Sequence, residues 1–346
     1  MSRPLPQRCC TEPGTQVSDY IAPRWLPGGH LQTIYPAKFI RPPDVTLNRE
    51  RWDTPDGDFI DVDFVEGLPG KPMLVLFHGL EGSSASHYAR SILKHIEGLG
   101  WSGAVPHFRG CSGEINRAPR FYHSGDSAEV DWILHKMALH PLSRNASNFF
   151  AAGVSLGGNA LLRWLGEYPD DSGFVEAACA ISAPLDLAAG GAALSRRLNM
   201  VYTRVFLQTL KPKCLLKLEQ FPGLFDADRM MAARDLYEFD NVVTAPLHGY
   251  RDTNDYWERA SAKQVLSSIT VPTLVLNARN DPFLPARHLP RSAARSVILE
   301  YPAQGGHVGF AGGRPPGALG WLPQRIVKFL SGQVALREHD HLALTD

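Results

Sequence analysis

Short apolar runs of strand length alternate with amphipathic stretches of helix length along most of this chain. Continuous apolar runs bounded by turn residues are typical of strands that are buried on both faces of a parallel sheet. The run at 71–77 fits this description, and five further strands are predicted at 103–107, 149–154, 175–182, 272–277 and 296–301. Helical periodicity is found in four further stretches: 86–99, 126–139, 156–167 and 319–330. The alternation predicts an α/β fold with a mostly parallel sheet and helices on both of its faces.

Two segments ahead of the first buried run have a different character. Residues 51–64 predict a β-hairpin, with Asp56-Gly57 as its turn and a second strand whose alternating pattern suits a half-exposed position. Residues 22–36 are so rich in proline and glycine that no regular element is expected there. His30 in this segment is interpreted as a packed or capping histidine, with a functional role as the alternative.

The strand pattern stops between residues 187 and 266, where only helical periodicity is found. We predict that this stretch is a helical lid inserted into the α/β core. Its many aromatic and methionine side chains would form a core of their own or, above the end of a sheet, line an apolar pocket. The predicted organisation is an arm at 1–20, the core at 21–186 and 267–332, the lid at 187–266 and a tail at 333–346.

Composition and charge narrow the class of protein. The chain has 346 residues, of which 44% are hydrophobic, so it can bury a sizeable core. Lys+Arg and Asp+Glu both number 35, which excludes a broad basic surface and argues against a nucleic-acid partner. Residues 1–18 do not resemble a signal peptide, and no stretch approaches the roughly 20 apolar residues that span a bilayer. A cytoplasmic protein without a transmembrane anchor is therefore expected.

No metal or cofactor is expected from the sequence. The five cysteines lack metal-ligand spacing and are interpreted as reduced thiols rather than as a disulfide framework. Neither H-E-x-x-H nor a pair of C-x-x-C motifs is present. His339-Asp340-His341 near the C-terminus is interpreted as part of a solvated tail rather than as a metal site.

The strand at 149–154 leads directly into the helix at 156–167 through Gly153-Val-Ser155-Leu-Gly157, which fits the G-x-S-x-G nucleophile elbow. A strand that turns at once into a helix strains the backbone at the serine, and its neighbours two residues away must lack a Cβ. The hydroxyl of Ser155 is then held above the sheet, at the positive end of the helix. Because serine alone is a weak nucleophile, a base and an acid are needed elsewhere.

Two later strands end in loops that supply these partners. Asp281 follows the run at 272–277, and His307 follows the run at 296–301. The chain order Ser155, Asp281, His307 is the one expected for α/β-hydrolases, and each residue follows a strand. His307 is predicted to take the proton of Ser155, and Asp281 to orient the imidazole. Taken singly, Asp281 could start a turn and His307 could be a loop residue.

Acyl transfer also requires donors for the developing oxyanion. The backbone amide of Leu156, at the start of the helix, is one predicted donor, and the amide of Leu80, in the loop after the run at 71–77, is the other. His78 in the same loop is interpreted as structural. The segment Tyr122-His-Ser-Gly125 is interpreted as a packed turn before a helix, with a place in the pocket wall as the alternative.

Several motifs resemble the YheT-like branch of the α/β-hydrolases, which includes plant embryogenesis-associated proteins and mammalian abhydrolase-domain lipases. The resemblance covers residues 20–330 and rests on the segments at 25–33, 78–84, 108–113, 120–125, 153–159, 255–261, 269–272 and 281–285. It implies a serine hydrolase that acts on carboxylic esters or acylglycerols without a cofactor, with Ser155, Asp281 and His307 as the triad. Relatives often carry two acids before the Pro-Phe pair, whereas here Asn280 leaves Asp281 as the acid. The N-terminal membrane anchor of the mammalian lipases is not expected here.

These observations favour a serine carboxylesterase or acylglycerol lipase that acts on short- or medium-chain esters or monoacylglycerols. A binding or regulatory protein that uses the same fold without turnover is the alternative from another class. A thioesterase or peptidase would use the same three residues, while a dehalogenase would need an aspartate in place of Ser155. A fluorophosphonate probe, which labels activated serines, distinguishes an enzyme from a binding protein.

Overall fold

The computed structural model describes the backbone of residues 15–16 and 18–343. Within these residues, nine strands form one sheet in the order β1-β9-β8-β7-β6-β4-β5-β3-β2. The strands are β1 (Thr15–Gln16), β2 (Asn48–Asp53), β3 (Phe59–Val65), β4 (Met73–Phe77), β5 (Ser102–Pro106), β6 (Phe149–Val154), β7 (Ala177–Ile181), β8 (Thr273–Leu276) and β9 (Val297–Glu300). In this order, all neighbouring strands from β1 through β9, β8, β7, β6 and β4 to β5 are parallel. Strand β3 pairs antiparallel with both β5 and β2. The predicted mostly parallel sheet is confirmed.

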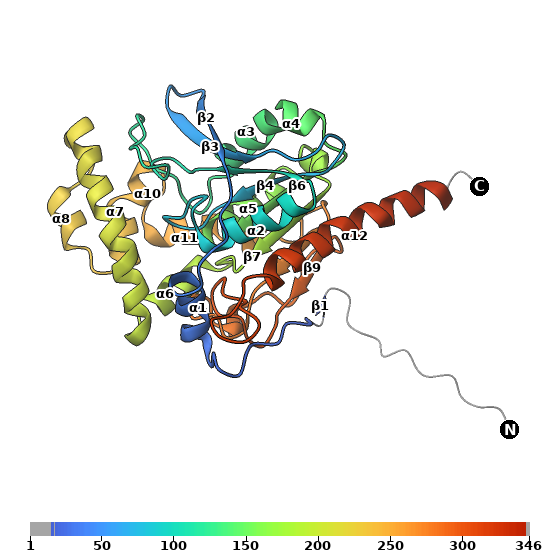
Figure 1. Ribbon diagram of the computed structural model, residues 1–346. Coiled ribbons are helices and arrows are strands. Elements are labelled where there is room, and N and C mark those ends of the chain that lie inside the picture. The colour runs from blue at the N-terminus through green and yellow to red at the C-terminus, as the bar shows by residue number, and fades with distance from the viewer. Residues whose placement is uncertain (1–14, 17, 344–346) are drawn as a thin grey trace.

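Helices cover both faces of this sheet (Figure 1). Alternate residues of β4 pack into two different hydrophobic cores, one on each face of the sheet. Met73 and Val75 pack with α3 (Ser127–Ala138) and α5 (Leu156–Glu167). Leu74 packs with α2 (His87–Gly98) and α12 (Trp321–Ala343). The continuous apolar character of the central strands follows, since neither side of such a strand contacts water. The remaining elements of the core are α1 (Gly29–Lys38), α4 (Pro141–Arg144), η1 (Ser172–Phe174) and η4 (Ala286–His288).

The hairpin formed by β2 and β3 is confirmed, but the half-exposed position predicted for its second strand is wrong. All seven residues of β3 are buried, because the strand lies between β2 and β5. Its polar residues are buried as ion pairs. Arg51 donates to Asp61, while Asp63 accepts from Arg49, His107 and Ser84. Burial alone would raise the pKa of Asp63, but these hydrogen bonds lower it below its usual range.

The expectation that residues 22–36 lack a regular element is also wrong, because α1 begins at Gly29 and includes Pro36. Proline removes one amide donor from a helix, and glycine costs conformational entropy, so the local sequence does not favour this helix. Its stability comes from tertiary contacts. Gln32 is 1% exposed and donates to the carbonyl of Leu26, and Thr33 is also buried.

The two chain ends differ from the predicted arm and tail. Residues 1–14 and 17 of the arm lie outside the described residues, but Thr15–Gln16 pair with β9, and the hydroxyl of Tyr20 donates to the carbonyl of Ala311. Tyr20 is buried, so it belongs to the core.

At the other end of the chain, α12 continues beyond residue 330 to Ala343, so the described part of the tail is helical. The side chains of 337–346 lie outside the described residues. Alanine, leucine, glutamate and arginine have high helix propensity, so the helix continues here although no apolar stripe in the sequence indicates it.

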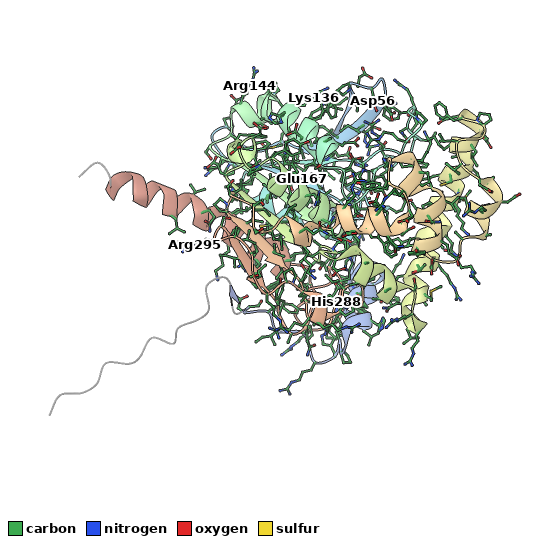
Figure 2. The ribbon with its side chains drawn as sticks, turned by 180° about the vertical axis from the view of Figure 1, so that it is seen from behind. Asp56, Lys136, Arg144, Glu167, His288 and Arg295 are labelled. Atoms are coloured by element: carbon green, nitrogen blue, oxygen red, sulfur yellow. The ribbon has the colours of Figure 1, made fainter. Side chains whose placement is uncertain are left out.

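The stretch between β7 and β8 is helical, as predicted, and lies at one end of the molecule, opposite to the projecting end of α12 (Figures 1 and 2). It contains α6 (Leu187–Leu194), η2 (Arg197–Asn199), α7 (Met200–Gln220), α8 (Ala227–Ala232), α9 (Leu236–Val242), α10 (Thr244–Leu247), α11 (Thr253–Ala260) and η3 (Ala262–Gln264). We call it the helical insertion. In the described part of the chain, no helix is long and apolar enough to cross a membrane.

Candidate active site

Ser155 stands at the junction of β6 and α5 in a conformation that L residues rarely adopt, with φ 52° and ψ −122°. Its amide donates to the carbonyl of Ile181 at 2.8 Å, which fixes the turn to β7. The glycines beside it leave no room for a side chain. A Cβ on Gly153 would lie 2.4 Å from the carbonyl oxygen of Gly157, and one on Gly157 would lie 2.4 Å from that of His78. The geometry is that of the predicted nucleophile elbow.

The structure brings the three predicted polar residues together. His307 Nε2 lies 2.9 Å from Ser155 Oγ, and His307 Nδ1 lies 2.9 Å from Asp281 Oδ2. The side chains of His307 and Asp281 are 10% and 1% exposed. The second carboxylate oxygen of Asp281 accepts from the amide of Phe283 at 2.7 Å. In this arrangement the serine hydroxyl donates to Nε2 of the imidazole, and the N–H at Nδ1 donates to the carboxylate.

Leu80 and Leu156 line the same cavity as Ser155. The amide of Leu156 is at the first position of α5, where a helix provides no acceptor for it. Among the hydrogen bonds of the described loops and turns, none involves the amide of Leu80. Both amides therefore have unused donor capacity next to the serine. Gly79, just before Leu80, could not carry a side chain without pressing on Ser155, because its Cβ would lie 3.1 Å from that of the serine.

The structural interpretation of His78 agrees with its contacts. Its Nδ1–H donates to the carbonyl of Gly79 at 2.7 Å, and its Nε2 accepts from the amide of Phe108 at 3.0 Å. These two bonds define a neutral imidazole that joins the loop after β4 to the loop after β5. Complete burial lowers the pKa of His78 to about 3, so the ring stays neutral at physiological pH.

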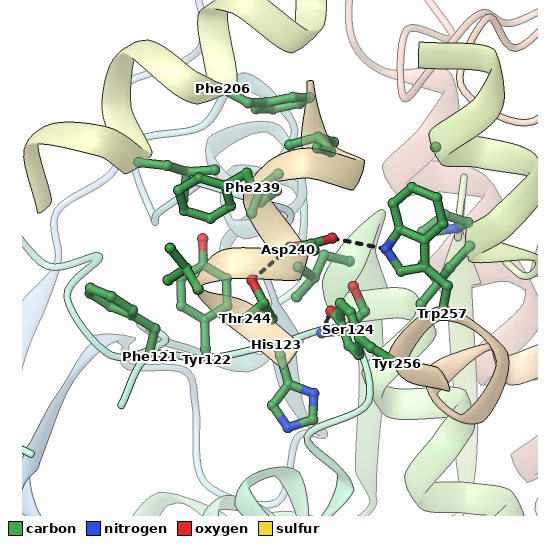
Figure 3. A pocket seen from close by; sticks show the side chains of 18 of the residues that line it. Phe121, Tyr122, His123, Ser124, Phe206, Phe239, Asp240, Thr244, Tyr256 and Trp257 are labelled. Atoms are coloured by element: carbon green, nitrogen blue, oxygen red, sulfur yellow. Dashed lines mark hydrogen bonds between the residues drawn. The ribbon is translucent and has the colours of Figure 1, made fainter. Parts of the chain in front are cut away.

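A cavity opens in front of Ser155, between the sheet and the helical insertion (Figure 3). It holds about 1080 Å³ of space between protein atoms, the solvent at its mouth included. Its wall is mostly apolar and comes from α6, α7, α9, α10 and α11 of the insertion, from the turn at Ser155 and from four loops of the core. A concave site with an apolar lining and few polar groups is typical of a small-molecule pocket.

The segment Tyr122-His-Ser-Gly125 belongs to this wall, so the structure agrees with both interpretations of it. Asn159 of α5 donates to the carbonyls of Ser124 and Ala260 and accepts from the amide of Ala262, which packs the segment against α11. A Cβ on Gly125 would lie 2.7 Å from that of Ala260. The amide of Ser124 donates to the hydroxyl of Tyr256 (Figure 3).

Comparison with known proteins places the chain in a family. The family described as alpha/beta hydrolase fold matches residues 72–313, a range that includes the residues of the site. Over 323 residues the chain is 38% identical to the Escherichia coli (strain K12) protein named "Putative esterase YheT", a match that covers 91% of this chain and 93% of that protein. The chain belongs to the α/β-hydrolase family.

Other relatives of this α/β-hydrolase carry names of the same kind. Over 335 residues it is 30% identical to phospholipase ABHD3 of Mus musculus, covering 93% of this chain and 80% of the relative. Over 273 residues it is 28% identical to the monoacylglycerol lipase of Saccharomyces cerevisiae, covering 75% and 59%. The predicted YheT-like branch is confirmed, and the chain is a hydrolase of the esterase and lipase type.

Solved structures support the α/β-hydrolase fold. The Pyrococcus furiosus esterase Pf2001 aligns with a TM-score of 0.52 and 15% identity over 84% of this chain and 98% of that chain. Est1E of Butyrivibrio proteoclasticus, solved with ferulic acid, aligns with a TM-score of 0.53 and 12% identity over 84% and 100%. At these identities the alignments show a common fold.

The hydrolase also contains residues of the site that the sequence did not reveal. Gln32 Oε1 accepts from the amide of Gly305 at 2.9 Å and from the side chain of Asn280 at 2.8 Å, and Thr33 Oγ1 accepts from the amide of His307 at 2.8 Å. Helix α1 thus holds the loops of His307 and Asp281 together. The available signal was the run of glycines and polar residues at 28–33, which is part of one segment that carries the family resemblance.

A series of aromatic rings links the helical insertion to His307 through Phe283, which belongs to the loop after β8. Phe283 stacks on His307 with ring centroids 3.9 Å apart, and Tyr202 and Phe206 of α7 pack against Phe283. His30 stacks on Tyr202 and lies 3.0 Å from its hydroxyl. The packed role predicted for His30 agrees with this contact. Among the described residues, no group of three or more His, Cys, Asp or Glu side chains could hold a metal ion.

Proposed function

We propose that this hydrolase cleaves carboxylic esters through an acyl-serine intermediate on Ser155. The observation that carries the proposal is the continuous hydrogen-bonded series Ser155, His307, Asp281, which begins at a serine in the wall of an apolar cavity. The names of its esterase and lipase relatives support the same reaction class.

In the acylation step, His307 Nε2 takes the hydroxyl proton of Ser155 while Oγ attacks the carbonyl carbon of the ester. The carbonyl oxygen becomes an oxyanion, which the amides of Leu80 and Leu156 stabilise by hydrogen bonds. Asp281 fixes the tautomer of His307 and stabilises the imidazolium. The intermediate then collapses, the bond to the alcohol oxygen breaks, and the alcohol leaves with the proton from His307.

In the deacylation step, a water molecule takes the place of the alcohol. His307 accepts a proton from this water as its oxygen attacks the acyl carbon, and the same two amides stabilise the second oxyanion. When this intermediate collapses, the bond between the acyl carbon and Ser155 Oγ breaks. The acid is released, and the proton returns from His307 to the serine.

The cavity determines which esters are expected. We infer that the helical insertion, predicted as residues 187–266, acts as a lid whose apolar side chains bind the acyl chain. Leu187, Leu194, Phe206 and Phe239 line the cavity together with Ser155. Such a wall favours short- or medium-chain esters or monoacylglycerols over charged substrates.

Hydrolysis of a p-nitrophenyl ester series from acetyl to palmitoyl tests this proposal. We expect activity with an optimum at short or medium chains and a loss of at least about 1,000-fold in kcat for Ser155→Ala. Ser268→Ala, an exposed serine outside the cavity, is the matched control and should retain full activity. Equal rates for wild type and Ser155→Ala would disprove the serine mechanism. An optimum at palmitoyl would contradict the substrate class.

A further inference from the structure

Glu81 directly follows Leu80, one of the two proposed oxyanion donors, and has a strained backbone. Its φ is 55°, in the left-handed region that L residues rarely adopt. The hydroxyl of Tyr122 stabilises this conformation at two points. It accepts from the Glu81 amide at 2.8 Å and donates to Glu81 Oε1 at 3.0 Å. Tyr122 itself is fixed by stacking on Phe108, with ring centroids 5.2 Å apart and an interplanar angle of 4°.

The carboxylate of Glu81 also forms an ion pair with a residue of the helical insertion. Lys213 of α7 donates to Glu81 at 2.8 Å, although the two residues are 132 positions apart in the sequence. The side chains are 8% exposed for Glu81 and 26% exposed for Lys213, and both line the cavity that contains Ser155. A largely buried carboxylate needs such a partner, because its desolvation is otherwise uncompensated.

From this geometry we propose that the Glu81–Lys213 ion pair couples docking of the helical insertion to the position of the Leu80 amide. The strained loop is held from the core by Tyr122 and from the insertion by Lys213. With α7 in place, the Leu80 amide is fixed beside Ser155. Without the ion pair, the largely buried charge of Glu81 has only uncharged donors, the hydroxyl of Tyr122 and the thiol of Cys111 at 3.9 Å, and the loop relaxes. Glu81 and Lys213 are thus positioning residues, and this inference rests on the proposed function.

The consequence is specific to the transition state. A shifted Leu80 amide weakens stabilisation of the oxyanion, which exists only after Oγ attack, whereas binding of the uncharged ester depends on the apolar wall. Disruption of the pair therefore lowers kcat and leaves KM nearly unchanged. A side chain that served only as part of the pocket wall would change KM instead.

The test is a double-mutant cycle of Lys213→Met and Glu81→Gln, measured on the best p-nitrophenyl ester of the series. We expect each single variant to lose about 10- to 100-fold in kcat, less than the loss of a whole oxyanion donor, with KM within about twofold. The double variant should lose no more than the worse single variant, because the two changes remove one interaction. Lys213→Arg should retain most of the activity.

An alkyl boronic acid gives an independent readout, because its tetrahedral, negatively charged adduct with Ser155 places an oxygen among the oxyanion donors. Its affinity should fall in parallel with kcat. The exposed pair Lys94–Glu97 of α2 supplies matched controls, Lys94→Met and Glu97→Gln, which should change neither quantity. If Lys213→Met does not fold, the inference is tested by comparing kcat of Lys213→Arg, which should be retained, with kcat of Glu81→Gln, which should fall.

Three results would overturn the inference. They are an unchanged kcat in the single variants, fully additive losses in the double variant, and a rise in KM without a change in kcat. An inactive wild type that Ser155-directed fluorophosphonate does not label would overturn the proposed function, and the inference with it. An active wild type whose kcat is insensitive to Lys213→Met would leave the serine mechanism standing and remove only the coupling.

Discussion

At the scale of single residues, close backbone contacts hold Ser155 and His307 in place. Ser155 has a positive φ, and so does Val308, directly after His307. The glycines nearby allow main chains to approach where a methyl group would collide. A Cβ on Gly309 would lie 1.8 Å from the carbonyl of Gln32, and one on Gly29 would lie 1.9 Å from that of Asn280. The contacts of these glycines preorganise the site before substrate arrives.

Replacement of Gly157 by alanine tests this argument at the elbow. The new methyl group would lie 2.4 Å from the carbonyl of His78, so either helix α5 or the loop that contains His78 and Leu80 must move. We expect a loss of about 2 kcal/mol or more in the free energy of unfolding, together with a large loss of kcat. Gly98→Ala, in open space at the end of α2, is the control and should be neutral or stabilising by up to about 1 kcal/mol. Equal stability of the two variants in urea unfolding would contradict the account.

Ser155, Asp281 and His307 could be predicted because each follows a strand, and strand ends of a parallel sheet meet at one edge. Gln32 and Thr33 could not. Their partners Asn280, Gly305 and His307 lie roughly 250 to 270 positions away. No local pattern reports a hydrogen bond between such distant segments, and a buried glutamine has the same appearance in a sequence as an exposed one.

At the scale of elements, the buried strands were predictable and the marginal helices were not. The strands have continuous apolar runs, which follow directly from burial on both faces. Helix α1 has no such signature, because glycine and proline oppose it locally and tertiary contacts stabilise it. Strand β3 appeared half-exposed because its Asp61 and Asp63 are polar, and the arginines that allow their burial belong to the neighbouring strand β2.

The packing of the short helices of the insertion depends on Asp240. Its carboxylate accepts from Thr244 of α10 at 2.6 Å and from the indole N–H of Trp257 of α11 at 2.8 Å (Figure 3). Burial raises the pKa of Asp240 to about 6, although these two hydrogen bonds oppose the shift. No ion pair of Asp240 is found among the described residues. The carboxylate therefore destabilises the fold when it ionises.

Asp240→Asn gives the expected pH dependence. Well below pH 4 the carboxyl is protonated in both the folded and unfolded states, so it adds no pH-dependent difference. Between about pH 4 and 6 the folded state retains a proton that the unfolded state has lost, and the stability of wild type falls as pH rises. The variant does not titrate. Its unfolding free energy relative to wild type should therefore increase over this range by about 1 to 3 kcal/mol and then stay constant. A difference that is independent of pH in chemical unfolding would contradict the assignment.

At the scale of the whole molecule, three distant parts of the chain meet around the serine. The sheet supplies the elbow and the loops of Asp281 and His307, α1 from the N-terminal region fixes those loops, and helices of the insertion line the cavity. Lys217 of α7, which is completely buried, fastens the insertion by donating to the carbonyls of Asn116 and Ala118. The helical character of 187–266 was predictable, but its placement was not, because such contacts join segments that the sequence keeps apart.

The central claim is that Ser155 is a nucleophile activated by His307 and Asp281. Peptide mapping by mass spectrometry after reaction with an alkyl fluorophosphonate tests it most directly. We predict one phosphonylated site, Ser155, in the wild type, no adduct in Ser155→Ala, and labelling slowed by at least about 100-fold in His307→Ala. An unlabelled wild type, or an adduct on another serine that persists in Ser155→Ala, would contradict the account.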